Sequence, residues 1–205
     1  MTPLTSRKYF LIFFFLIFLS ASCCRTSGQM SYPEQEVRVQ GLPAVTARSS
    51  RSSDVLAASL EMVFDDKEIC CGKNSALEDS VQSPDPKSLK DIAGKLQGRH
   101  HFSDGRPILV TAEFLTPEQV TASHLIYMLK EKHAALMMWK SHLYVVDGVT
   151  YVENIDPDGA ISYVTHKFLL EDARFSGARS EVTFDRTTED GSKVQGLLFL
   201  QAAPQ

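Results

Sequence analysis

Apolar residues recur at helical spacing in three stretches of the chain, and these stretches predict its helices. They are residues 54–66 (DVLAASLEMVFDD), 88–98 (SLKDIAGKLQG) and 116–133 (TPEQVTASHLIYMLKEKH). In the first stretch, the LEMVF segment is also compatible with a strand. In the third stretch, Thr116 is expected to cap the helix, Pro117 to occupy its first position and Gln119 to complete a capping box. Helices are therefore expected mainly in the first half of the folded part.

The pattern changes after residue 133 to short β-branched and aromatic runs. The runs AALMMW, HLYVV, VTYVE, AISYV and KFLL are separated by turn signals that include DG and DPDG. The last two runs, in EVTFDR and KVQGLLFL, are expected to close the sheet as a hairpin. Helices followed by antiparallel strands indicate an α+β fold.

Residues 1–23 have the pattern of an export signal. Arg7 and Lys8 precede the apolar run FLIFFFLIFL, and small residues follow before Cys23. The run is about ten residues long, whereas a spanning helix needs roughly 20, so cleavage is expected. The stretch LSASCC also resembles the lipobox of bacterial lipoproteins, although Leu19 lies four residues before Cys23 instead of three. That resemblance implies lipidation of Cys23 and a membrane-anchored, extracytoplasmic protein; ordinary signal-peptidase cleavage is the alternative.

Composition divides the rest of the chain into two parts. Residues 24–53 are rich in Ser, Arg, Gln and Pro without a sustained period, which predicts a flexible tether. Residues 54–205 are numerous enough for one domain with a hydrophobic core. The net charge of −4 and the absence of a basic stripe with interleaved aromatic residues argue against nucleic acid as a partner.

The folded part holds the adjacent cysteines Cys70 and Cys71. Adjacent Cα atoms lie about 3.8 Å apart, whereas disulfides prefer about 4.4–6.8 Å, so a bond between the two is disfavoured. Zinc sites need separated ligands, and neither a metal nor an organic cofactor is expected. The stretch after Gly72 is expected to form a short helix capped by Asn74. A cysteine at the start of a helix is favoured as the nucleophilic thiolate.

A helix-opening cysteine followed by a histidine, His142, that begins an apolar strand resembles the papain-like cysteine peptidase superfamily. CCGKNSAL is similar to the opening of the bacterial branch that includes peptidases trimming bacteriocin leaders, and SHLYVVDGV resembles its histidine strand. The similarity spans about residues 60–175. It implies a papain-like fold with N-terminal helices packed on a C-terminal antiparallel sheet. It also implies cleavage of a peptide or amide bond, with Cys71 as nucleophile, Cys70 as the alternative, and His142 as base.

The resemblance further implies an Asp or Asn that orients His142. If DPDG forms the main hairpin turn, residue 142 lies opposite residue 173, and Asp172 is the favoured partner. If Asp147 and Gly148 form the turn, His142 faces residue 153, so Asn154 and Asp156 are the alternatives. A slip of one residue exchanges the faces of the strand, and the sequence leaves this register open.

The segment FDDKEIC before Cys71 departs from the family pattern because it has no Gln or Asn to hold the oxyanion. Losing one such donor typically costs about 10²–10³ in rate. Asp65 and Asp66 also oppose formation of a nearby thiolate. Three hypotheses follow: an exported cysteine peptidase or amidase, an inactive binding or structural lipoprotein of the same fold, and a thiol-redox or metal-sensing protein that uses Cys70 and Cys71.

Overall fold

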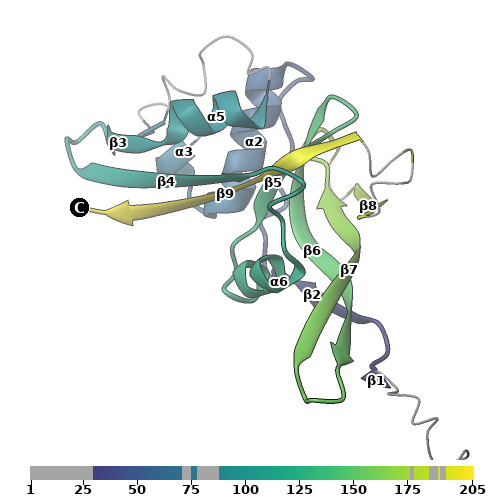
Figure 1. The fold of residues 1–205 in the computed structure, drawn as a ribbon. Helices are drawn as coiled ribbons and strands as arrows, with labels where there is room; N and C mark the ends of the chain where they lie inside the picture. Colours follow the sequence, from purple (N-terminus) through teal and green to yellow (C-terminus); the bar gives the residue numbers. More distant parts are fainter. Residues whose placement is uncertain (1–29, 71–74, 78–87, 176–177, 185–188, 190–192) are drawn as a thin grey trace, which may run out of the picture.

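A mixed α+β fold with one large antiparallel sheet is seen in the computed structural model, which describes residues 30–70, 75–77, 88–175, 178–184, 189 and 193–205 (Figure 1). The main strand order is β3–β4–β9–β5–β6–β7–β8, and β1 and β2 also pair with β6. The strands are β1 (Met30–Ser31), β2 (Gln35–Arg38), β3 (Gly98–His101), β4 (Pro107–Leu115), β5 (Ala135–Trp139), β6 (His142–Ile155), β7 (Ile161–Glu171), β8 (Arg179–Thr183) and β9 (Val194–Pro204). The helices of the described part are α2 (Ser52–Phe64), α3 (Lys67–Cys70), α5 (Leu89–Leu96) and α6 (Ala122–Lys130).

Helix α5 forms as its sequence pattern predicts. Its four apolar positions are all buried, and the Ser88 side chain caps the helix by accepting a hydrogen bond from the Asp91 N–H at 3.1 Å. Helix α2 likewise covers the first predicted stretch, including the LEMVF segment. The sequence periodicity is sufficient here because both helices bury an apolar face against the sheet.

Helix α6 begins later than predicted. It starts at Ala122, and its cap is Thr121, whose side chain accepts a hydrogen bond from the His124 N–H at 3.3 Å. The Gln119 side chain does accept the Thr116 N–H at 2.9 Å, as a capping box requires, but residues 117–119 form a separate turn. The local contact was therefore predicted correctly, and the helix boundary was wrong by several residues.

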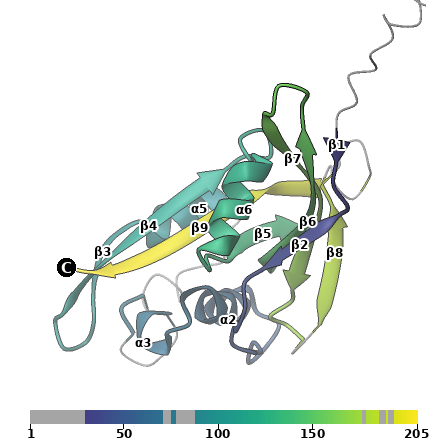
Figure 2. The same ribbon diagram turned by 90° about the horizontal axis from the view of Figure 1, so that it is seen from below.

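The C-terminal strand β9 lies inside the sheet instead of closing a hairpin with β8. It pairs with β4 on one side and β5 on the other, whereas β8 pairs with β7. Helices α2 and α5 cover one face of this region and α6 covers the other (Figures 1 and 2). Residues 197–200 are therefore all buried, which explains their continuous apolar run.

Strand β6 continues through Asp147 and Gly148, so the tight turn considered there is wrong. The register with β7 pairs Val145 with Glu171 and Ile155 with Ile161, which leaves residues 156–160, with DPDG in them, as the hairpin connection. A bulge between Val146 and Gly148 lets the strand change direction without ending. The lower halves of β6 and β7 project from the body as an arm (Figures 1 and 2).

Residues 30–51 are part of the fold, in contrast to the predicted flexible tether. Strands β1 and β2 pair with β6 beyond the end of β5, and Val39 is buried. The Val39 N–H donates to the Asp147 carbonyl at 2.6 Å, and the Ala47 N–H donates to the Ala173 carbonyl at 2.7 Å. Because β6 is longer than β5, its free edge supplies the hydrogen bonds that order this polar segment.

The predicted signal, residues 1–23, and the remaining residues up to 29 lie outside the described part. Among the described helices, none has both the length and the apolar character needed to cross a membrane.

Candidate functional site

His142 lies at the first position of β6, directly after a tight turn from β5. Lys140 and Ser141 both have positive φ, 50° and 64°, which is the backbone of the hairpin turn whose twist matches the flanking strands. Trp139 and His142 are paired across this turn. The His142 side chain is consequently exposed at one end of the sheet.

Asp172 follows directly after β7 and lies close to His142. Continuing the Val145–Glu171 register by one residue places Asp172 opposite Tyr144, two positions from His142 on the same face of β6. The sequence expectation of a hairpin centred on DPDG therefore brings the predicted base and its favoured partner to the same end of the sheet.

The carboxylate of Asp172 is nevertheless bound by Arg174. Arg174 Nε donates to Oδ1 at 2.8 Å and Nη2 donates to Oδ2 at 2.6 Å, and the Arg174 N–H adds a bond of 2.9 Å to Oδ1. Burial raises the pKa of Asp172, but the bonds and charge of Arg174, with a contribution from His142, outweigh burial and lower it. Within the described residues, no hydrogen bond joins Asp172 to His142.

Arg174 also organises the aromatic side chains around it. Nη2 donates to the Tyr144 hydroxyl at 3.1 Å, and the guanidinium carbon lies 5.5 Å from the Tyr144 ring centre and 5.7 Å from that of Phe175. Trp139 contacts Tyr144 with ring centres 5.6 Å apart. We call this group the Arg174 cluster; it consists of Trp139, His142, Tyr144, Asp172, Arg174 and Phe175.

The Arg174 guanidinium has one nitrogen that is left for a ligand. Among the described residues, the Arg174 Nη1 atom has no hydrogen-bond partner, while Nε and Nη2 are engaged. The Phe175 side chain beside it is exposed. The cluster thus offers two N–H donors next to aromatic surface.

Neither of the two cysteines predicted as the nucleophile is described beside His142. Cys71 lies outside the described residues. Cys70 is buried, is disulfide-bonded and closes α3 instead of opening a helix. Residues 75–77, part of the helix predicted after Gly72, form a turn that bonds back to α3 through the Ala76 N–H and the Glu68 carbonyl at 3.1 Å. A buried, oxidised cysteine is not nucleophilic, which disfavours Cys70.

Helix α3 and His142 lie at different ends of the sheet. Glu68 of α3 forms an ion pair of 3.6 Å with Arg106, which precedes β4. The start of β4 pairs with the end of β9 at Pro204, whereas Trp139, the partner of His142, pairs with Val194 at the start of β9. Figure 2 also shows α3 on the far side of α2 from β6.

The segment that precedes helix α2 lies beside the Arg174 cluster. This segment is held to the residue after Asp172 by the bond from Ala47 to Ala173. The first turn of α2, Ser52–Val55, contains no cysteine. The helix that begins beside the Arg174 cluster therefore contains no cysteine.

The alternative orienting residues lie at the far end of β6. Asn154 is paired with Ser31 and Ser162, next to the turn that contains Asp156. Twelve residues of strand separate Asn154 from His142, which corresponds to about 40 Å. Asn154 and Asp156 are therefore too distant to orient His142.

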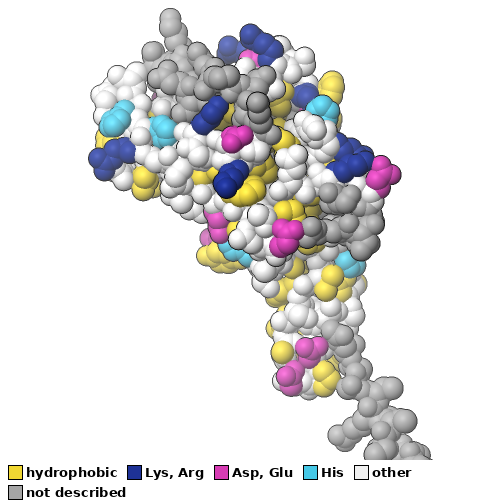
Figure 3. Space-filling model, turned by 45° about the horizontal axis from the view of Figure 1, so that its top comes forward, with side chains coloured by type: hydrophobic (Ala, Val, Ile, Leu, Met, Phe, Trp, Pro, Cys, Tyr) yellow, Lys and Arg dark blue, Asp and Glu magenta, His cyan; other side chains and the backbone are white. Residues whose placement is uncertain are grey.

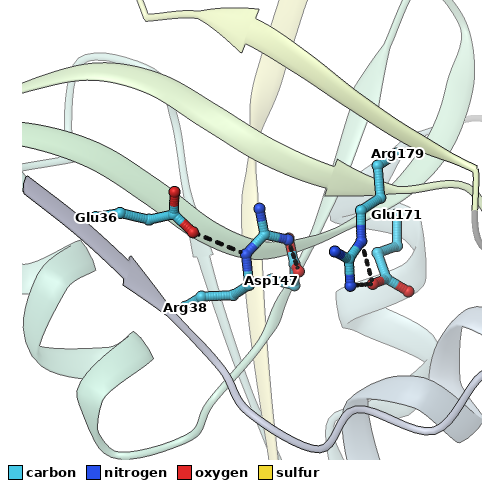
Figure 4. Close-up of polar contacts among 5 residues, drawn as sticks. All are labelled: Glu36, Arg38, Asp147, Glu171 and Arg179. Carbon is cyan, nitrogen blue, oxygen red and sulfur yellow. Dashed lines mark hydrogen bonds and ion pairs between the residues drawn. The ribbon is translucent and has the colours of Figure 1, made fainter.

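A second polar group, missed by the sequence analysis, joins β2 to β6 (Figure 4). Arg38 forms a close ion pair with Asp147 through Nη1 and Oδ2, and its Nε donates to Glu36 at 3.1 Å. The Asp147 side chain is only 2% exposed, and its Oδ1 has no hydrogen-bond partner among the described atoms. Burial raises the pKa of Asp147, although Arg38 opposes the change.

In the described part of the chain, no three His, Cys, Asp or Glu side chains are grouped so that they would hold a metal ion. No family model matches the chain, and no curated protein or solved structure matches it.

Proposed function

We propose that the protein is an exported binding protein of papain-like architecture that does not hydrolyse its ligand. The observation that carries the proposal is the ion pair between Arg174 and Asp172. A catalytic imidazole needs a third group to hold its orientation, and the carboxylate expected in that role, Asp172, uses both oxygens to bind Arg174. His142 is therefore left exposed and without that support.

The cysteines favour the same proposal. Cys70 is buried and disulfide-bonded, and the first turn of α2 has no cysteine. A disulfide is also typical of an oxidising compartment, which supports export. For the metal-sensing hypothesis, the described residues contain no group of metal ligands that would support it.

The Arg174 cluster suits an extended peptide as the ligand. The charge of Arg174 is balanced by Asp172, so the free Nη1 donors favour a neutral carbonyl oxygen over an anion. Exposed Phe175 and partly exposed Trp139 provide apolar surface for a side chain of the peptide. Aromatic residues beside an arginine are enriched where proteins bind tightly.

The absence of catalysis is tested by the reactivity of Cys71. The purified protein and its His142→Ala variant are treated with iodoacetamide from pH 5 to pH 9, with and without prior reduction, and labelling of each cysteine is followed by mass spectrometry. We expect slow labelling at pH 6 that is the same in both proteins, and no cleavage of a fluorogenic casein substrate. Fast labelling of Cys71 at pH 6 that slows in His142→Ala would instead establish the cysteine peptidase.

Binding is tested with a pool of random decapeptides passed over the immobilised protein. We expect retention of peptides that share an apolar or aromatic position, and loss of this retention in Phe175→Ala. Tyr127→Ala is the matched control, because Tyr127 is an exposed aromatic residue on α6. Equal retention by both variants, or retention by neither the variants nor the parent protein, would contradict the proposal.

A further inference from the structure

A glutamate lies between two tyrosines on one face of the arm. The register pairs Glu153 of β6 with Tyr163 of β7. On the other side, the pairing of Met30 with Ile155 places Tyr32 opposite Glu153, and the Tyr32 N–H donates to the Glu153 carbonyl at 2.9 Å. Directly opposed residues share a face of the sheet, with Cβ atoms about 4.5–5.5 Å apart. The side chains of Tyr32, Glu153 and Tyr163 therefore form a row, which we call the tyrosine–glutamate row.

A third tyrosine holds one end of this row in place. The rings of Tyr151 and Tyr163 meet edge to face, with centres 5.8 Å apart. Tyr151 is buried, and its hydroxyl donates to the Gln35 side chain at 3.0 Å. Tyr32, by contrast, is 42% exposed. The row thus presents one fixed ring and one exposed ring on the two sides of a carboxylate.

The negative charge of the row is not balanced within the arm. Among the described residues, the Glu153 carboxylate takes part in no ion pair, and residues 30–36 and 150–165 contain no Lys or Arg. Asp156 and Asp158 add negative charge at the turn, and Figure 3 shows acidic side chains at the end of the arm. The faces of aromatic rings also attract cations. Two tyrosines around an unbalanced carboxylate consequently favour a positively charged ligand.

An apolar row lies beside the tyrosine–glutamate row on the same face. It consists of Met30, Ile155 and Ile161, which are paired in that order, and Met30 and Ile161 are 62% and 56% exposed. The two rows are two residues apart along the strands, or about 7 Å. Side chains at positions i and i+2 of an extended peptide have the same spacing and point to the same side. An extended peptide can therefore place one side chain on each row.

We propose that this face of the arm binds an extended basic segment of a polypeptide, with an arginine on the tyrosine–glutamate row and an apolar side chain on the apolar row. A guanidinium stacks on aromatic rings and donates two parallel hydrogen bonds to a carboxylate, which matches the groups of the first row. Charge complementarity selects this partner over an anionic one. The site lies at the opposite end of β6 from the Arg174 cluster, so the inference is independent of the proposed function.

The experiment follows the tyrosine rings while a peptide binds. The full chain is produced with ¹³C-labelled tyrosine, and its ring signals are recorded by NMR during titration with an unlabelled peptide. The peptide consists of glycine and serine with one arginine and, two residues later, one leucine. A second peptide carries citrulline, which has the shape of arginine without its charge. Tyr127 on α6 is the exposed control, and Tyr144 reports on the Arg174 cluster.

We expect the arginine peptide to shift the signals of Tyr32 and Tyr163 and to leave Tyr127 and Tyr144 unchanged, and the citrulline peptide to shift none of them. Glu153→Gln should weaken binding about fivefold, as expected for an exposed ion pair. Tyr32→Leu should weaken it about threefold by removing one ring face. Asp158→Asn is the matched control, because it removes a charge from the same arm outside the row, and it should change binding less than about twofold at physiological salt.

Equal shifts with the arginine and citrulline peptides would overturn the proposal, because the site would then not select a cation. This comparison uses the parent protein and does not depend on the folding of any variant. Equal losses in Glu153→Gln and Asp158→Asn would also overturn it, since the general acidity of the arm would then be sufficient. Shifts confined to Tyr144, or no shifts at all, would show that the arm does not bind the peptide.

Discussion

Replacing Arg38 by methionine removes the partner of a buried carboxylate while keeping much of the aliphatic stem. Asp147 is 2% exposed at the side chain, and Arg38, at 26%, is its ion-pair partner (Figure 4). Breaking a buried ion pair by removing one partner typically costs about 3–5 kcal/mol, because the remaining charge stays buried. Since Arg38 is partly in contact with water, we expect a loss near the lower end, about 3 kcal/mol in the free energy of unfolding at pH 7.5.

The loss in the free energy of unfolding caused by Arg38→Met should increase as the pH rises. Burial raises the pKa of Asp147, with Arg38 acting in the opposite direction. A carboxyl group with a raised pKa in the folded state favours folding at low pH, and this contribution is lost as the pH rises through that pKa. Without Arg38 the pKa rises further, so the cost of Arg38→Met increases with pH above the usual Asp value. At pH 4.5 the cost should be clearly smaller than at pH 7.5.

Urea unfolding followed by circular dichroism at the two pH values measures both effects. Arg106→Met is the control, because Arg106 pairs with Asp104 and Glu68 at an exposed position and should change stability far less at either pH. A loss from Arg38→Met no greater than that from Arg106→Met would refute the reasoning. So would a loss that is the same at pH 4.5 and pH 7.5.

Three further changes have expected outcomes in the same unfolding assay. Asp172→Asn should cost about 2 kcal/mol at pH 7 and progressively less as the pH falls below the usual Asp range, because Arg174 lowers the pKa of Asp172; a loss independent of pH would contradict this. Gly196→Ala should cost about 3 kcal/mol or more, since φ is +139° and a Cβ would lie 2.5 Å from the Leu115 carbonyl, whereas Gly94→Ala in α5 meets no atom within 4 Å and should stabilise. Ser88→Ala should cost about 1 kcal/mol by removing the cap of α5; no change would show that the cap is not used.

Part of the candidate site was predictable from local sequence. DPDG is a strong turn signal, and a hairpin centred on it brings Asp172 to the same end of the sheet as His142. Arg174 was not predicted to bind Asp172, because the choice between two neighbouring partners depends on side-chain geometry. Tyr144 joined the site only when the register of β6 and β7 was known.

Part of the fold could not be predicted from the sequence, because it depends on pairing between strands that are distant in the chain. The apolar run of β9 indicates burial on both faces, but its neighbours β4 and β5 are separated from it by long stretches of chain. The short alternation in residues 36–39 is too brief to indicate a strand. It becomes β2 because β6 extends beyond the end of β5 and offers a free edge.

The sequence by itself determined the helices α2 and α5, the presence of a strand-rich second half and the turn after β6. These features depend on periodicity, caps and turn residues, which act between residues close in the chain. The tertiary structure alone decided that β9 is central, that β1 and β2 join the sheet, and that Asp172 binds Arg174 instead of His142. Those outcomes depend on contacts between distant segments, whose free energies are set by burial and hydrogen bonding in the assembled fold.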